Sequence, residues 1–414
     1  MFLQNLNLLL KRKAKNSVPP WIDLDAASTT PIYEEVLRAM GPYYSEIYFN
    51  PNSVHAAGQL AARALTYNRQ IVADYFAVRS QKILFASSAT EANNWIIESC
   101  SRIKLPTQKK PHIIYSAIEH DSVIAPILRL KNEGVITTTI LPVGQNGLVD
   151  IGTLEKALTK ETVLVSIMAV NNEIGSLEPL LSIGQSLAKF KNQQKTLYPY
   201  FHSDAAQGLN YFHWPDLKYL DCLTFSGHKI NGPKGIGGLA IFNSQMLKTI
   251  VPLTVGGHQE FNLRAGTENL PAIIGLAKAL EILKQNSASD HERLFRLRSL
   301  FWETLQEYHS HILLNGDLNA SVPSIINCYF PGILASDMVA GLSEKGVLAS
   351  PGAACSASLG TPSHVIYALY HDKERAQESV RFSFGRSLDY DNVKHAAQLT
   401  AGLYTQLLSL KNTL

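Results

Sequence analysis

The chain has 414 residues, of which 46% are hydrophobic, and its formal net charge is +3 at pH 7. Because the charges nearly cancel, no broad basic field predicts direct binding to nucleic acid or to a membrane surface. No apolar stretch approaches the roughly 20 residues that a membrane-spanning helix needs. The length exceeds the size at which one hydrophobic core stops growing, which predicts two domains.

Residues 1–21 are interpreted as an N-terminal extension. The first 22 residues contain no acid and include a basic cluster, Lys11, Arg12, Lys13 and Lys15. A secretory signal has its charges before a longer apolar region, so export is not expected. The preferred interpretation is a solvated extension or short docking helix in a cytoplasmic protein, and an organellar leader is the alternative.

From residue 58 the hydrophobic pattern alternates between helices and strands. Helical spacing covers about 60–76, and short apolar runs predict strands at 82–86, 112–115, 137–141, 162–170, 200–202, 220–225 and 239–242. Strands that alternate with helices predict an α/β fold with a largely parallel sheet covered on both faces. Ligands bind beyond the carboxyl ends of such strands, so polar residues that follow each strand are candidate site residues.

The pattern changes after residue 270. It predicts a helix at 272–284, a polar interruption at 285–290 and a second helix at 293–308. Two strands, at 324–330 and 346–349, and a C-terminal helix follow. We therefore predict a large domain at 22–270 and a smaller α+β domain at 271–414.

A phosphate site is predicted after the strand that ends at residue 86. Ser88 and Glu91 have the spacing of a capping box, which places the first turn of a helix at the edge of the sheet. The backbone N–H groups and the helix dipole at such a terminus attract anions. An ordinary capped helix has the same pattern, so this motif is only moderately specific.

Three further strand ends carry polar residues that suit a pyridine cofactor. His120 can stack on a flat ring and move protons. Asn172 can orient a carboxylate or ring substituent, and Asp204 can pair with a protonated pyridine nitrogen, the interaction that makes pyridoxal phosphate an electron sink. Each of these residues alone is more simply explained as structural.

Lys229 follows the next strand and precedes a glycine-rich turn. The amine of a lysine in such a site can form a Schiff base with an aldehyde cofactor. A loop lysine between two strands is the alternative. Because five strand ends of one sheet each supply a group that one cofactor requires, we predict that the cofactor is pyridoxal 5'-phosphate.

Eight short motifs occur in a fixed order along the chain: Leu24-Asp-Ala-Ala-Ser-Thr-Thr-Pro31, Asn50-Pro-Asn-Ser-Val-His55, Ser88-Ala-Thr-Glu-Ala-Asn-Asn94, Glu119-His120, Asn171-Asn-Glu-Ile-Gly175, Asp204-Ala-Ala-Gln207, Ser226-Gly-His-Lys229 and Arg264-Ala-Gly-Thr-Glu-Asn269. Their content and order resemble the signature blocks of cysteine desulfurases. These are fold-type I pyridoxal-phosphate enzymes of the class V aminotransferase superfamily. The resemblance covers residues 22 to about 390.

The resemblance implies roles for individual residues. It implies a phosphate site that consists of Ala89, Thr90, Ser226 and His228. It also implies that Gln207 bonds the ring oxygen, that Asn172 lies near the ring and the substrate, and that Arg381 holds the substrate carboxylate. In the family, the position of Thr267 reaches the phosphate of the neighbouring subunit, which implies a homodimer.

Cys355 matches the persulfide-forming cysteine of the family's group I members. It lies in Ala349-Ser-Pro-Gly-Ala-Ala-Cys355, where small residues predict a loop rather than a core position. The resemblance implies that L-cysteine is the substrate, that Cys355 takes its sulfur, and that an acceptor protein such as an iron–sulfur scaffold or a thiolation enzyme receives it. The other cysteines, Cys100, Cys222 and Cys328, are expected to be buried and inert. No spacing suits a zinc site, and the absence of paired cysteines favours a reducing compartment.

Two positions depart from the family pattern. His258 stands where a third glycine is usual, and Pro351 stands where a serine is usual. Proline fixes φ, so the base of the segment that carries Cys355 is expected to be stiffer. The alternatives left open are a selenocysteine lyase or an aminotransferase of the same fold, and a catalytically silent scaffold that binds sulfur acceptors.

Overall fold

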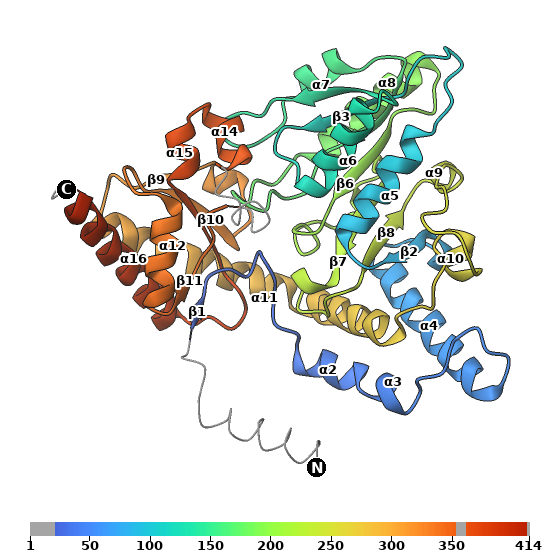
Figure 1. The fold of residues 1–414 in the computed structure, drawn as a ribbon, viewed down its shortest axis with the longest axis horizontal. Coiled ribbons are helices and arrows are strands. Elements are labelled where there is room, and N and C mark those ends of the chain that lie inside the picture. The colour runs from blue at the N-terminus through green and yellow to red at the C-terminus, as the bar shows by residue number, and fades with distance from the viewer. Residues whose placement is uncertain (1–20, 353–361, 412–414) are drawn as a thin grey trace.

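A computed structural model describes residues 21–352 and 362–411 of the chain. The described residues form a sheet-bearing body and a C-terminal body (Figure 1). One helix, α11 (Leu270–Tyr308), runs from the first body into the second. None of the described helices is long and apolar enough to cross a membrane.

A seven-stranded sheet forms the centre of the first body, within the described part of the chain. Its strands stand in the order β2-β8-β7-β6-β5-β3-β4. Among these strands only β8 runs opposite to the others, so its pairs with β2 and β7 are antiparallel and all the other pairs are parallel. The strands are β2 (Ile83–Ala86), β3 (His112–Ser116), β4 (Thr137–Leu141), β5 (Thr162–Ser166), β6 (Tyr200–Asp204), β7 (Cys222–Ser226) and β8 (Gly237–Ile241). Each lies within or beside a predicted strand, which confirms the predicted sheet.

Helices cover both faces of this sheet. Leu84 belongs to a hydrophobic cluster that includes residues of α5 (Ala89–Ser101) and α6 (Asp121–Asn132). Its neighbour Phe85 belongs to a different cluster, which includes residues of α4 (Ala56–Tyr75), α8 (Leu180–Gln194) and the first half of α11. Successive strand residues point to opposite faces, so a strand covered on both sides must be apolar throughout. This requirement explains the short continuous apolar runs in the sequence.

The C-terminal body has its own core around a small antiparallel sheet. Its strands are β9 (Leu313–Leu314), β10 (Ile325–Tyr329) and β12 (Ser379–Ser383), and α12 (Ala335–Glu344) and α16 (Tyr390–Lys411) pack nearby. The C-terminal body also contains two shorter helices, α14 (His364–Tyr370) and α15 (Lys373–Gln377).

The start of the described chain also belongs to the C-terminal core. β1 (Ile22–Asp23) pairs in parallel with β11 (Val347–Leu348), and both Ile22 and Leu24 are buried in that core. The chain then passes directly to the carboxyl edge of the large sheet. The domain boundary at residue 270 stays a prediction, because α11 contributes residues to both cores.

The predicted interruption at 285–290 is wrong, because α11 is continuous. This segment contains no glycine or proline, and four of its polar side chains, those of Asn286, Ser287, Ser289 and Asp290, have partners. Asn286 Nδ2 donates to the carbonyl of Ile282 at 2.9 Å, and Asp290 pairs with Arg386. A polar run ends a helix only where it offers the backbone a better alternative, and here it does not.

Candidate active site

A pocket lies beyond the carboxyl ends of the large sheet and encloses about 210 Å³. That volume far exceeds the roughly 15 Å³ that a cavity needs to hold one water. Ten of the twelve predicted site residues line it: Ala89, Thr90, His120, Asn172, Asp204, Gln207, Ser226, His228, Lys229 and Arg381. Thr267 is exposed and is not among the lining residues, and Cys355 lies outside the residues that the structure describes. The structure thus brings most of the predicted residues together, while their individual roles remain predictions.

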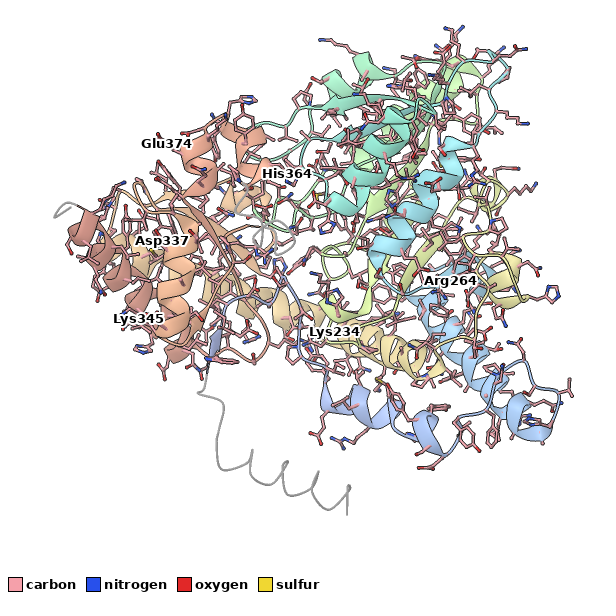
Figure 2. All side chains as sticks on the ribbon, viewed as in Figure 1. Lys234, Arg264, Asp337, Lys345, His364 and Glu374 are labelled. Atoms are coloured by element: carbon pink, nitrogen blue, oxygen red, sulfur yellow. The ribbon has the colours of Figure 1, made fainter. Side chains whose placement is uncertain are left out.

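The first turn of α5 forms one wall of the pocket. Ser88 caps the helix and accepts a hydrogen bond from the backbone N–H of Glu91 at 3.2 Å. The Glu91 carboxylate accepts from the backbone N–H of Ser87 at 3.0 Å and pairs with Arg264, which is labelled in Figure 2. The first-turn amides of a helix have no acceptors within the helix, so this wall offers N–H donors to an anion.

A glycine in the neighbouring strand permits this arrangement. A Cβ atom at Gly237 in β8 would lie 2.8 Å from the carbonyl carbon of Ser88 and 2.9 Å from the nitrogen of Ala89. Both distances are too short for a real side chain. Only glycine therefore lets β8 pass this close behind the start of α5.

Lys229 reaches the pocket from the short helix η3 (Gly227–Lys229), which begins directly after β7. Its Nζ atom donates to the carbonyl oxygens of Ala27 at 2.6 Å and Ser28 at 2.9 Å. Gln207 Nε2 donates to the same Ala27 carbonyl at 2.8 Å. The segment that follows β1 therefore orients two of the predicted cofactor-binding side chains.

His228 lies beside Lys229, and its charge state is determined by its surroundings. Burial lowers the pKa of His228 to about 4, and the charges of Lys229 and Lys234 add to this effect. Nδ1 of His228 lies 3.1 Å from the hydroxyl of Thr29. A histidine with this pKa is neutral near pH 7, so it offers an anion a hydrogen bond rather than a charge.

Asp204 ends β6 and is 5% exposed. One carboxylate oxygen accepts from the backbone N–H of Ala206 at 2.9 Å, and the other accepts from Asn93 Nδ2 at 2.7 Å. These two bonds hold the carboxylate at the edge of the pocket. A carboxylate in such a position suits a cationic ring nitrogen.

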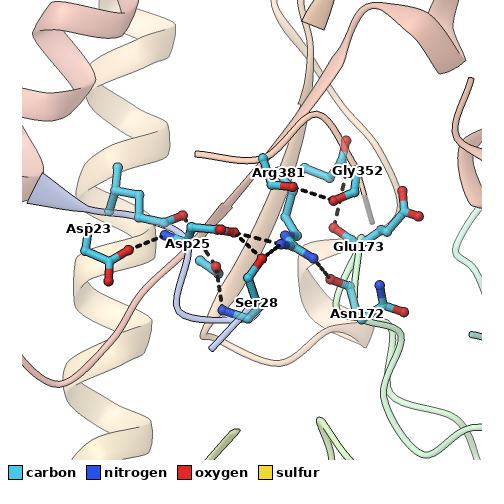
Figure 3. Close-up of polar contacts among 12 residues, drawn as sticks. Asp23, Asp25, Ser28, Asn172, Glu173, Gly352 and Arg381 are labelled. Atoms are coloured by element: carbon cyan, nitrogen blue, oxygen red, sulfur yellow. Dashed lines mark hydrogen bonds and ion pairs between the residues drawn. The ribbon is translucent and has the colours of Figure 1, made fainter. Parts of the chain in front are cut away.

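Arg381 enters the pocket from β12 of the C-terminal body and is 2% exposed. Its guanidinium donates to the carbonyl of Asn172 at 2.9 Å, and to Asp25 Oδ1 and Ser28 Oγ at 2.7 Å each (Figure 3). Its Nε atom is buried and has no hydrogen-bond partner among the described residues. The guanidinium of Arg381 can therefore bind a substrate carboxylate, but one of its nitrogens already forms an ion pair with Asp25.

Several lining residues were not predicted: Ala27, Ser28, Ser122, Met168, Val170 and Ala206. Ser28 belongs to the Asp25 to Thr30 run of small and hydroxyl side chains that follows β1. Like the predicted site residues, this run follows a strand, so its position could have marked it as part of the site. The strand, β1, has only two residues, however, and a hydrophobic pattern cannot reveal a strand that short.

Three cysteines are buried, as expected. Cys100, Cys222 and Cys328 are each 0% exposed, and burial raises the pKa of each thiol above its usual range. A buried thiol that resists deprotonation is a poor nucleophile. None of these three is therefore suited to take sulfur from a substrate.

Comparison with known proteins identifies the class. A profile of the class-V aminotransferase family matches residues 22–395, so the chain belongs to that family. A putative cysteine desulfurase IscS 1 of Bacillus subtilis (strain 168) is 36% identical over 389 residues, which are 93% of this chain and 99% of the relative.

Solved structures show the same likeness. A NifS-like protein has a TM-score of 0.84 and 30% identity and covers 93% of this chain and 99% of its own. SspA in complex with cysteine has a TM-score of 0.74 and 31% identity over 87% of this chain and 98% of its own. Within the class-V family, the chain is a cysteine desulfurase.

Proposed function

We propose that this enzyme binds pyridoxal 5'-phosphate through Lys229, removes sulfur from L-cysteine and collects it as a persulfide on Cys355. The observation that carries the proposal is the pocket, where Lys229 from η3, Asp204 from the end of β6 and Arg381 from β12 converge. These residues supply an amine, a carboxylate and a guanidinium. An aldehyde cofactor with a pyridine ring needs the first two, and the carboxylate of an amino-acid substrate needs the third.

The described residues fit this cofactor. The N–H groups at the start of α5, with neutral His228 and Ser226, would hold its phosphate, and Asp204 would hold its ring nitrogen. His120 would lie against the ring, and Gln207 would bond the ring oxygen. When bound, the cofactor supplies an electron sink for bonds at the substrate's α-carbon.

Residues of the chain would perform the remaining tasks. Lys229 would bond the cofactor's aldehyde and, once released, carry the α-proton on Nζ. Arg381 would orient the substrate through its carboxylate, since a planar guanidinium makes two parallel hydrogen bonds to it. The buried position of Arg381 would exclude water from these bonds and strengthen them.

The sulfur step is a transfer between two thiols. The carbon–sulfur bond of L-cysteine breaks and a sulfur–sulfur bond to Cys355 forms. The substrate carbon gains a hydrogen and leaves as L-alanine, while Cys355 becomes a persulfide. L-cysteine and one thiol thus become L-alanine and one persulfide, with no other oxidant or reductant.

We further propose a homodimer, an acceptor protein for the persulfide sulfur, and a cytoplasmic location. A second copy of the chain would cover exposed apolar side chains, Tyr44, Tyr48, Val54, Val255 and Phe261. Asn52 Nδ2 donates to Glu268 at 3.3 Å, which ties the segment before α4 to the segment that carries Thr267. An iron–sulfur scaffold or a thiolation enzyme is the proposed type of acceptor.

The test measures both products from L-cysteine in the presence of a reductant. We expect alanine and sulfide in equal amounts. Lys229→Ala should abolish both, and Cys355→Ser should abolish sulfide while the protein keeps the yellow colour of bound cofactor. Undiminished alanine and sulfide from Cys355→Ser would contradict the persulfide step, and a protein that stays colourless with the cofactor would favour the silent scaffold. Activity on selenocysteine alone would favour the lyase.

A further inference from the structure

Two side chains, Asn93 and Ser122, connect Asp204 to His120 by hydrogen bonds. Thr224 Oγ1 donates to Asn93 Oδ1 at 2.6 Å, and Asn93 Nδ2 donates to Asp204 Oδ2 at 2.7 Å and to Ser122 Oγ at 2.8 Å. Ser122 Oγ in turn lies 2.8 Å from His120 Nδ1. All of these residues except His120 are less than 9% exposed, so water does not compete for these bonds.

The chemistry of the partners fixes the direction of each bond. The Asn93 amide cannot be reversed, because its oxygen would then face an oxygen of the Asp204 carboxylate, and neither atom carries a hydrogen to donate. Asn93 therefore donates to Ser122 Oγ. The hydroxyl hydrogen of Ser122 remains available for His120 Nδ1.

A second donor converges on the same ring nitrogen. His120 is the N-cap of α6, and its Nδ1 accepts the backbone N–H of Ser122 at 3.0 Å. A nitrogen that accepts two hydrogen bonds carries no proton. In the neutral imidazole, the ring hydrogen must then be on Nε2.

We propose that Asn93 and Ser122 are positioning residues that hold His120 as the Nε2–H tautomer. His120 lines the pocket, so it presents a hydrogen-bond donor there. In this form the ring has no vacant nitrogen to take a proton from an incoming thiol. If the proposed function holds, His120 acts first as a donor to the sulfur or carboxylate of L-cysteine, and the same network couples its tautomer to the Asp204 carboxylate.

Nitrogen NMR tests the tautomer directly, on the cofactor-loaded protein labelled with ¹⁵N-histidine. Spectra are recorded at about pH 8, where an unperturbed imidazole is neutral, and the His120 signals are identified by their loss in His120→Gln. We expect two well-separated ring nitrogen shifts, with the protonated one assigned to Nε2. A protonated Nδ1, or a single averaged shift, would overturn the proposal.

Variants at position 122 test the positioning role. Ser122→Ala removes the hydroxyl and keeps the backbone N–H, so the two ring shifts should move toward each other, and kcat/KM for alanine release should fall about fivefold, the effect of one ordinary hydrogen bond. Ser122→Thr keeps a hydroxyl and should restore both. Ser101→Ala is the matched control, because Ser101 is a buried serine in α5 whose hydroxyl donates to the carbonyl of Glu98, and it should leave the His120 shifts unchanged.

The two proposals fail in different ways. A fixed Nε2–H tautomer in a protein that releases no alanine would contradict the function and support the positioning network. Alanine release with His120 shifts that do not respond to Ser122→Ala would overturn the network and leave the function in place.

Discussion

The carboxylate of Glu173 accepts a 2.6 Å hydrogen bond from the hydroxyl of Ser363, 190 residues later in the chain. Glu173 belongs to the loop after β5, next to Asn172 of the pocket, and Ser363 caps α14 in the C-terminal body. Gly352 lies near Glu173 (Figure 3), and a Cβ atom at Gly352 would lie 3.2 Å from the same carboxylate oxygen. Glu173 therefore bonds Ser363 and lies close to Gly352, the described residues that flank the segment 353–361, which contains Cys355.

The first prediction concerns this bond. Ser363→Ala should lower the free energy of unfolding by about 1–3 kcal/mol, because it leaves a buried carboxylate unpaired and removes a helix cap. Ser363→Asp supplies a good cap but sets a second carboxylate against Glu173, so it should not restore stability. Ser363→Thr should restore most of it. Urea unfolding measures all three, and a stable Ser363→Asp variant would contradict the Glu173 contact.

The second prediction concerns Arg381. Arg381→Lys should raise the KM for L-cysteine at least about tenfold, because an ammonium cannot replace a bidentate fork. Arg298→Lys is the matched control, since Arg298 is equally buried but bonds Ser321 and the carbonyl of Val322 outside the pocket. Steady-state kinetics should show a KM change in the first variant alone. Equal KM values in both would argue against the carboxylate clamp.

The third prediction concerns pH. Burial raises the pKa of Glu178 from 4.5 to about 8. Between these values the folded protein keeps a proton that the unfolded chain has lost, so the free energy of unfolding falls as the pH rises from about 4.5 to about 8. Glu178→Gln removes this loss. It should be more stable than the wild type at about pH 8 by roughly 1–3 kcal/mol, and the difference should shrink at about pH 5.

Urea midpoints at the two pH values measure this effect. Glu307→Gln, at an exposed position of α11, is the control and should change stability at neither pH. A Glu178→Gln variant that gains no stability at the higher pH would show that the buried carboxyl is not the source of the pH dependence.

The fourth prediction concerns thiol reactivity. Cys100, Cys222 and Cys328 are buried with raised pKa values, so native Cys355→Ser should take up almost no iodoacetamide. The same variant should take up three equivalents once it is unfolded, since the chain has four cysteines in all. Mass spectrometry counts the label. Rapid labelling of any of the three in the native variant would contradict their burial.

Much of the sheet and of the pocket was predictable because both depend on local patterns. The strands of a sheet covered on both faces are short apolar runs, and their order in the chain places Ser88, His120 and Asp204 at one edge. The continuity of α11 was not predictable in the same way. It depends on contacts between residues that are far apart in the chain, such as the ion pair between Asp290 and Arg386, which are 96 residues apart.

The sequence by itself determined the family and predicted the cofactor class, since most signature residues have a fixed place after a strand. Only the tertiary structure decided which neighbours act on those residues. Asp25 forms an ion pair with Arg381, and the carbonyls of Ala27 and Ser28 accept hydrogen bonds from Lys229. Asn93 and Ser122 connect Asp204 to His120 by hydrogen bonds. The physical reason is that a hydrogen bond needs its donor and acceptor within about 3 Å, and folding alone brings together groups that lie tens or hundreds of residues apart.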